Sequence, residues 1–312
     1  MNSDYEVIEI PFPHGSDGYA GRECPECEEY FKIVFGTGLE GTTHCYCPYC
    51  GYKGDHDEFY TQEQNNYIES VALNRLTTEL LRGFKQIERY NRPRSAGLFN
   101  IEFRVEGKPT PIRYPQEFSL ETYVDCSNCT LKYAIYGVYA FCPDCGRRNA
   151  HQILETSLDI AIKVLQLTDT SEPALLDTLI SNALTSVVAS FDGYGREICR
   201  TYASKASNFP QAKKIRFQNL AGAQTQVRQC FSFDMASSLT TPEWEMAIRC
   251  FQKRHVLEHN SGVIDDDYVK KANDPMAILG RKVVLTADEV RQLIHLVRRL
   301  GKHIVYQMEQ LP

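Results

Sequence analysis

Apolar residues recur at helical spacing in one long stretch of the first third of the chain. Between residues 62 and 90 they return every three or four positions, which predicts an amphipathic helix with one buried face. Asparagine, proline, serine and glycine at 91–97 end this pattern. The predicted buried face consists of Ile68, Val71, Leu73, Leu76, Leu80, Phe84 and Ile87.

Strand-like patterns lie on both sides of this helix. Residues 1–60 have the pattern of short strands and turns, and residues 100–114 alternate apolar and polar side chains around a Gly-Lys-Pro turn, as a hairpin does. Residues 131–141 are rich in β-branched and aromatic side chains, which favour strands. We therefore expect β-rich modules at 1–60 and 96–152, joined by a connecting helix within 61–95.

The rest of the chain, residues 153–312, carries helical patterns almost throughout. Long patterns cover 153–167, 173–203, 217–233 and 241–259, and a short β-like piece, RKVVL, precedes a last helix. Thr286 and Glu289 form a capping box at the start of that helix. Its apolar stripe consists of Val290, Leu293, Ile294, Val297, Leu300, Ile304 and Met308.

Eight of the twelve cysteines form four CxxC pairs, and the pairs come in two sets. The pairs are separated by 19 residues in the first set and by 12 in the second. Four thiolates satisfy the tetrahedral preference of zinc and close its shell, so we expect two structural Zn²⁺ sites in modules that resemble zinc ribbons. His44 and Cys45 are alternative ligands beside the first set. The preferred ligands are Cys24, Cys27, Cys47, Cys50, Cys126, Cys129, Cys142 and Cys145.

Charge is distributed unevenly between the two halves. Residues 1–150 contain 15 basic and 22 acidic residues, whereas residues 151–312 contain 19 basic and 18 acidic ones. The acidic front half is therefore a poor candidate for nonspecific nucleic-acid binding. No apolar run reaches the roughly 18 residues of a membrane span, and the N-terminus lacks the pattern of a secretory signal, so we expect a cytoplasmic protein without membrane contact. Affinity for polyanions is expected in the back half, around Lys213, Lys214 and Arg216 or Arg249, Lys253 and Arg254.

The stretch RHVLEHNSGVID, residues 254–265, concentrates the chemically useful side chains of the helical half. In one interpretation His255 extends an apolar helix face that includes Phe251, and the Asn-Ser-Gly triplet at 260–262 ends the helix. In a second interpretation His255 and His259, four residues apart, bind a metal, although no third ligand is evident. In a third interpretation the stretch is a catalytic centre.

The third interpretation rests on a resemblance. Arg254, the polar His255 beside it and His259 five positions after Arg254 are similar to the Arg-x4-His motif of the HEPN superfamily, and Arg249 with His255 is an alternative register. The continuation NSGVIDDDYV resembles the Asn-x-Gly, Asp and Tyr pattern of toxin and defence members of that superfamily. The resemblance covers roughly residues 153–312 and implies metal-independent cleavage of RNA by a homodimer.

The resemblance also implies roles for the site residues. His259 would act as general base or acid, because imidazole titrates near physiological pH. Arg254 would hold the phosphate, while His255 and Asn260 would be supporting donors. The expected products carry a 2′,3′-cyclic phosphate and a 5′-hydroxyl. Residues five apart on a helix point about 140° away from each other, so a site shared between two chains is expected.

Together these patterns predict an α+β multidomain protein, in which two small β-rich zinc ribbons precede an all-α, HEPN-like helical bundle. The expected function is that of an endoribonuclease of toxin or antiviral-defence type, with an RNA substrate and a homodimeric state. The zinc ribbons would be structural or regulatory modules that contact a regulatory protein partner. The alternative is a non-catalytic zinc-ribbon binding protein with a HEPN-like dimerisation domain.

Overall fold

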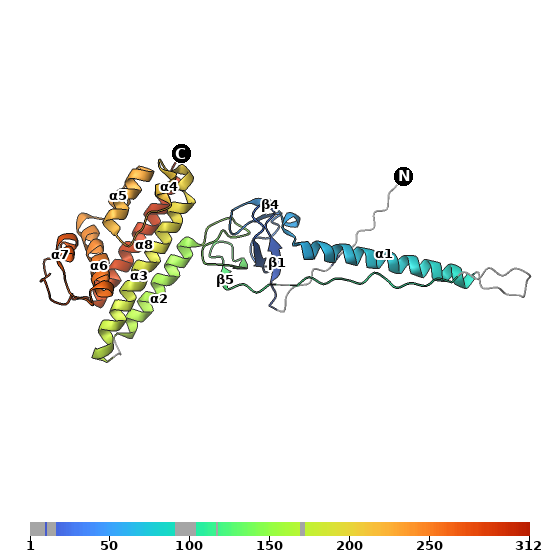
Figure 1. The fold of residues 1–312 in the computed structure, drawn as a ribbon, viewed down its shortest axis with the longest axis horizontal. Coiled ribbons are helices and arrows are strands. Elements are labelled where there is room, and N and C mark those ends of the chain that lie inside the picture. The colour runs from blue at the N-terminus through green and yellow to red at the C-terminus, as the bar shows by residue number, and fades with distance from the viewer. Residues whose placement is uncertain (1–9, 11–16, 91–103, 117, 169–171) are drawn as a thin grey trace, which may run out of the picture. The chain divides into compact units, whose positions relative to one another are not determined.

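The computed structural model describes residues 10, 17–90, 104–116, 118–168 and 172–312 (Figure 1). They belong to two compact units, Met1–Arg148 and Asn149–Pro312. The first unit combines small antiparallel sheets with one long helix, and the second unit is helical. The expected α+β class, with β structure ahead of a helical half, is confirmed.

Four short strands form the main sheet of the first unit. They are β1 (Ala20–Glu23), β2 (Tyr30–Ile33), β5 (Thr122–Asp125) and β6 (Lys132–Ile135), in the order β1-β2-β6-β5 with antiparallel neighbours. At the centre β2 pairs with β6, with Ile33 opposite Tyr133. Strands of the first cysteine module therefore share one sheet with strands of the second. A separate hairpin consists of β3 (His44–Tyr46) and β4 (Lys53–Asp55), followed by the short helix η1 (His56–Phe59).

Backbone hydrogen bonds and a common core also join the two cysteine modules. The amide of Tyr46 donates to the carbonyl of Pro143 at 2.7 Å, and the amide of Phe141 donates to the carbonyl of Pro48 at 2.8 Å. Apolar side chains from both modules are buried together, which removes them from water as one cluster. Its members include Phe31, Phe59, Leu131, Tyr133 and Ile135.

Helix α1 (Gln62–Tyr90) spans the stretch in which the sequence predicts a helix. It begins at a capping box, because the amide of Gln64 donates to the Thr61 hydroxyl and the amide of Thr61 donates to the Gln64 side chain, both at 3.1 Å. An extended segment, residues 104–116, lies along α1 and forms no strand. The predicted hairpin at 100–114 is therefore wrong for its described part, and residues 100–103 lie outside the described residues.

Polar side chains of α1 hold the extended segment. Asn74 Nδ2 donates to the carbonyl of Thr110 at 2.6 Å, and the amide of Arg113 donates to the Ser70 hydroxyl at 3.0 Å. These hydrogen bonds satisfy a backbone that has no sheet partner. The segment thus occupies a polar face of α1.

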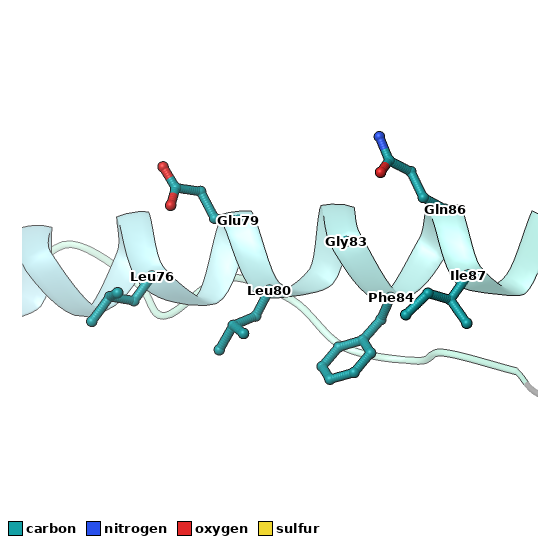
Figure 2. A pocket seen from close by; sticks show the side chains of 7 residues that line it. All are labelled: Leu76, Glu79, Leu80, Gly83, Phe84, Gln86 and Ile87. Atoms are coloured by element: carbon teal, nitrogen blue, oxygen red, sulfur yellow. The ribbon is translucent and has the colours of Figure 1, made fainter. Parts of the chain in front are cut away.

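The apolar stripe of α1 is half-buried at Ile68 and Val71 and exposed from Leu73 onward, which contradicts the predicted burial for most of this face. Leu76 and Leu80 are 54% and 58% exposed, and Phe84 and Ile87 are nearly as accessible. In Figure 2 these four side chains line one side of the helix, around a shallow groove that includes Gly83. Helical periodicity predicts which residues share a face, but it does not show what covers that face.

In its described residues the second unit is a bundle of five longer helices with short helices between them. Helix α8 packs against α2, α3 and α6, and its predicted apolar stripe is buried throughout. The capping box at Thr286 and Glu289 is present. The piece RKVVL forms only an isolated bridge, between Val263 and Lys282. The helices are α2 (Ala150–Leu167), α3 (Pro173–Thr201), α4 (Phe209–Ala212), α5 (Leu220–Phe231), α6 (Thr241–His259), α7 (Asp266–Ala272) and α8 (Ala287–Glu309), with 3-10 turns η2 (Ala203–Lys205) and η3 (Met235–Ser238).

Candidate metal centres and the histidine pair

All four CxxC pairs adopt the same tight turn. In each turn the amide of the first cysteine donates to a carbonyl five residues later, as from Cys47 to Tyr52 and from Cys142 to Arg147, both at 2.8 Å. A second hydrogen bond runs back to the first cysteine carbonyl from the residue that follows the second cysteine. That residue has positive φ in every turn, which favours glycine. The four residues are Glu28, Gly51, Thr130 and Gly146.

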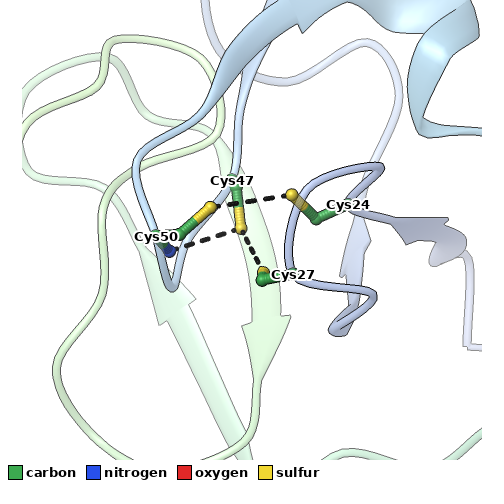
Figure 3. A group of neighbouring side chains, drawn as sticks. All are labelled: Cys24, Cys27, Cys47 and Cys50. Carbon is green, nitrogen blue, oxygen red and sulfur yellow. Dashed lines mark hydrogen bonds between the residues drawn. The ribbon is translucent and has the colours of Figure 1, made fainter.

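The turns bring the eight cysteines into two four-sulfur groups, as the sequence predicts. In the first group the sulfurs of Cys24 and Cys50 are 3.7 Å apart, and those of Cys27 and Cys47 are 3.6 Å apart (Figure 3). The corresponding distances in the second group are 3.8 Å from Cys126 to Cys145 and 3.5 Å from Cys129 to Cys142.

These sulfur positions fit a tetrahedral zinc ion. Four sulfurs about 2.3 Å from a metal centre at tetrahedral angles are about 3.8 Å from one another. Within each group all sulfurs lie within 4.8 Å of one another. Each group could therefore hold one Zn²⁺ with four protein ligands and no free coordination position, which is the arrangement of a structural site.

Burial disfavours the thiolate form of several cysteines in the two four-sulfur groups. Burial raises the pKa of Cys27 to about 11 and that of Cys129 to about 11. Burial also raises the pKa of Cys47, and the amides of Tyr49 and Cys50, 3.4 and 3.5 Å from its sulfur, offset this only in part by stabilising negative charge. Metal binding supplies the positive charge that keeps buried thiolates deprotonated.

The alternative ligands of the first set lie outside the four-sulfur group. The buried Cys45 thiol contacts the Tyr46 carbonyl at 3.9 Å, and burial raises its pKa to about 12. His44 is exposed, and its Nδ1 lies 3.0 Å from Asp55 Oδ1. The choice of Cys47 and Cys50 over these two residues therefore agrees with the geometry.

The second candidate site is the last turn of α6. His255 and His259 are exposed on one face of the helix, and their ring centroids are 4.7 Å apart. The exposure of His255 contradicts the interpretation in which this residue extends a buried apolar face of the helix. The described residues place only the two cysteine groups at metal-binding distances, so no third ligand accompanies the histidines there.

Arg254 lies apart from the exposed imidazoles, as the helical wheel predicts. It is 8% exposed, and its guanidinium forms an ion pair with Glu258 at 2.8 Å. Its buried Nε has no hydrogen-bond acceptor among the described residues. Arg249, the arginine of the alternative register, donates to the carbonyl of Asn273 at 3.1 Å.

The turn after the motif is fixed by its own hydrogen bonds. Ser261 and Gly262 have left-handed backbones, and the amide of Gly262 donates to the carbonyl of Val256 at 3.0 Å, so the helix stops where the Asn-Ser-Gly triplet predicts. The Asn260 side-chain Nδ2 donates to Asp265 Oδ2, and Asp265 caps α7 by accepting from the backbone amide of Tyr268 at 2.7 Å. Asn260 is therefore engaged in holding this turn.

Two acidic residues form ion pairs with Arg254 and with its neighbour Lys253, and the sequence patterns had not indicated either pair. Glu258 neutralises Arg254, and Glu289 accepts from the buried Lys253 ammonium at 2.6 Å. Lys253 also donates to the carbonyl of Val284 at 2.7 Å and thereby joins α6 to the start of α8. The spacing of Arg254 and Glu258, four residues apart on a helix, was the available signal for the first pair.

The three side chains of the expected basic cluster, Arg249, Lys253 and Arg254, thus all form contacts within the protein. The cluster at Lys213, Lys214 and Arg216 is exposed.

No protein-family model, curated protein or solved structure matches this chain. Among the described residues, no helix combines the length and apolar character needed to cross a lipid bilayer.

Proposed function

We propose that the helical unit is a metal-independent endoribonuclease of HEPN type, with the exposed His255–His259 pair at its centre. The observation that carries the proposal is the placement of two imidazoles side by side at the end of α6, in a helix that also carries the buried Arg254. Imidazole can accept and donate protons near neutral pH, so a pair of imidazoles suits an acid–base reaction.

The reaction is a transesterification within RNA. The 2′-oxygen forms a bond to phosphorus and the bond from phosphorus to the 5′-oxygen breaks, which gives a 2′,3′-cyclic phosphate. One base removes the proton of the 2′-hydroxyl, and one acid delivers a proton to the departing 5′-oxygen. His259 performs one of these transfers, and His255 supports it.

Displacement at phosphorus proceeds with the attacking and departing oxygens roughly in line. The two imidazoles of one chain lie on the same helix face, so they approach the phosphate from one side. A second copy of the chain would supply the proton transfer on the opposite side. The proposed active form is therefore a homodimer in which two α6 ends face one RNA strand.

Arg254 is the proposed phosphate ligand. A guanidinium binds two phosphate oxygens in parallel and stays charged at all relevant pH values. In the structure the Arg254 guanidinium instead binds the Glu258 carboxylate at 2.8 Å. Substrate binding therefore requires the phosphate to replace that carboxylate.

The zinc sites are proposed to hold the first unit together, and the first unit is proposed to regulate the nuclease through a protein partner. A closed four-cysteine shell has no position for substrate, which favours a structural role. Toxin or antiviral-defence activity in the cytoplasm is the proposed setting.

Cleavage of labelled RNA by the full-length protein, without added metal and with retained zinc measured in parallel, tests the proposal. We expect His259→Ala and Arg254→Ala to lower the cleavage rate by about 10²-fold or more, because each removes a group that acts in the transition state. The matched control is His295→Ala, which removes an exposed histidine of α8 and should leave the rate unchanged.

A second candidate function is a non-catalytic module in which the helical unit serves dimerisation and the first unit binds a partner. The burial of Arg254 and its ion pair with Glu258 favour this candidate. It predicts that wild type, His259→Ala and His295→Ala are equally inactive on varied RNAs while remaining dimeric.

A further inference from the structure

The segment between the end of α3 and the end of α5 has an unusual charge pattern. Residues 198–233 contain no aspartate or glutamate, although the whole chain has 40 acidic residues among 312. The same segment contains six basic residues: Arg200, Lys205, Lys213, Lys214, Arg216 and Arg228. Among the described residues, Arg228 is the only one of these six that forms an ion pair with an acidic residue. Its partner, Asp234, lies just beyond the segment.

The other five cations are exposed and lie around the end of α3, η2, α4 and the turn that follows α4. Burial alternates along this turn, because Ile215 and Phe217 are buried while Lys214, Arg216 and Gln218 between and beside them are exposed. These two cations and the Gln218 amide, here called the basic row, therefore face solvent.

Buried contacts fix this basic row on the helical unit. The Phe217 ring packs over Gly195 of α3, where a Cβ atom would lie 2.5 Å from the ring. The Phe217 amide donates to Asp192 Oδ1 at 2.6 Å, and Asp192 is itself only 4% exposed. The nearby carboxylate is thus used inside the protein, so it does not neutralise the exposed cations.

An exposed aromatic ring accompanies the cations. Phe209 at the start of α4 is 46% exposed, and the Lys213 ammonium lies 4.2 Å from its ring centroid. Exposed Asn208 precedes it, and its side chain accepts from the amide of Gln211. Cations that follow a backbone and an aromatic ring on which a base stacks are the two elements of single-strand recognition.

We infer that this basic surface, defined by Lys213, Lys214, Arg216 and Phe209, binds the phosphate backbone and a base of single-stranded RNA. An acidic protein segment would use the cations but would have no need of the exposed ring. The choice of RNA among single-stranded nucleic acids rests on the proposed function, whereas the binding itself does not depend on catalysis.

The surface lies at the opposite end of α8 from the histidine pair. Lys205 donates to the carbonyl of Leu311 at 2.7 Å, just beyond the C-terminus of α8, whereas Lys253 in α6 binds Glu289 near the N-terminus of α8. The 20 positions from Glu289 to Glu309, the last residue of α8, correspond to about 30 Å of helix. The surface is therefore separate from the proposed cleavage centre, and it would hold a part of the RNA that is not cut.

The test measures binding of the full-length protein to a fluorescein-labelled 2′-O-methyl oligouridylate, which chemistry at the 2′-hydroxyl cannot cleave. We expect the triple variant Lys213→Ala, Lys214→Ala, Arg216→Ala to bind about tenfold more weakly or worse. The slope of log K against log salt should become shallower by about 2, since each lost phosphate contact removes about 0.7. Phe209→Ala should also weaken binding about tenfold, through loss of stacking.

The matched control is the triple variant Lys85→Ala, Lys108→Ala, Lys163→Ala, which removes the same charge from exposed lysines elsewhere. It should change neither the affinity nor the salt slope. Equal binding by the two triple variants, with unchanged circular dichroism, would overturn the inference, and so would a wild type that does not bind the probe.

Competition and cleavage assays separate RNA binding at this surface from acidic-protein binding and from catalysis. If polyaspartate competes as strongly as RNA per charge, and Phe209→Ala has no effect, the surface serves an acidic protein and the RNA inference is wrong. If the probe binds as expected but unmodified RNA is not cleaved, the proposed nuclease function fails while the RNA-binding surface stands.

Discussion

At the scale of single residues, the position after each CxxC pair decides how easily the turn forms. All four positions have positive φ, but two of them carry side chains, Glu28 and Thr130. Left-handed backbone costs roughly 1–2 kcal/mol for a residue with a Cβ atom. The glycines that follow CPYC and CPDC were recognisable in the sequence as turn residues, whereas the same conformation at Glu28 and Thr130 was not.

We expect Thr130→Gly to raise the free energy of unfolding of the zinc-loaded protein by about 1 kcal/mol, because it relieves this backbone strain. Gly146→Ala should lower it by about 2 kcal/mol or more, since strain adds to a contact between the new Cβ and Tyr46 Cε1 at 3.0 Å. Denaturant titration at saturating zinc measures both. If both substitutions changed the free energy of unfolding in the same direction and by the same amount, the shared turn geometry would be contradicted.

The ion pair between Arg254 and Glu258 leads to a kinetic prediction. Glu258→Gln removes the carboxylate that, in the proposed mechanism, competes with substrate phosphate for the guanidinium, so RNA cleavage is expected to become several-fold faster at low substrate concentration. Initial rates of Glu258→Gln and wild type, with Glu245→Gln on the same helix as control, provide the measurement. A slower Glu258→Gln enzyme would mean that Glu258 positions Arg254 for its function.

At the scale of elements, sequence patterns predicted where the long helices lie, but they predicted the burial of the apolar face correctly for α8 and wrongly for most of α1. Helix α8 begins at its capping box and buries its predicted stripe, and α6 ends at His259 before the Asn-Ser-Gly triplet. Local hydrogen bonds decide such ends, so a single sequence contains them. The burial of the α1 stripe could not be predicted, because it depends on whether another element packs there.

The exposed stripe of α1 predicts tolerance to polar substitution. Leu76→Gln combined with Leu80→Gln should change the free energy of unfolding of the monomeric protein by less than about 1 kcal/mol in thermal denaturation, since both side chains are already more than half exposed. Leu293→Gln on α8, where the side chain is fully buried, is the contrasting variant and should destabilise strongly. Strong destabilisation by the α1 double variant would show that this stripe is covered.

At the scale of the whole molecule, the two cysteine modules form one folding unit. The pairing of β2 with β6 joins residues about a hundred positions apart, and no local pattern in the sequence specifies such a partner. The spacing of the cysteines predicted both four-sulfur groups, but it did not predict that they share a sheet and a core.

This organisation predicts the effect of metal removal. The zinc-loaded protein should contain two Zn²⁺ per chain, and Cys47→Ser should disturb both sites, because their residues share one core. The second unit has its own buried core, so chelation should leave most of the helical circular dichroism in place. Loss of only one zinc in Cys47→Ser, with an intact second site, would contradict the shared core.

The proposed cleavage of RNA at the end of α6 should depend on the 2′-hydroxyl of the substrate. The decisive measurement compares an RNA substrate with the same strand carrying a single 2′-deoxy nucleotide at the cleaved position. We expect wild type to cut the RNA to a 2′,3′-cyclic phosphate and to leave the deoxy position intact, and we expect His259→Ala to lose all cleavage. Cleavage at the deoxy position, or undiminished cleavage by His259→Ala, would contradict the proposed mechanism.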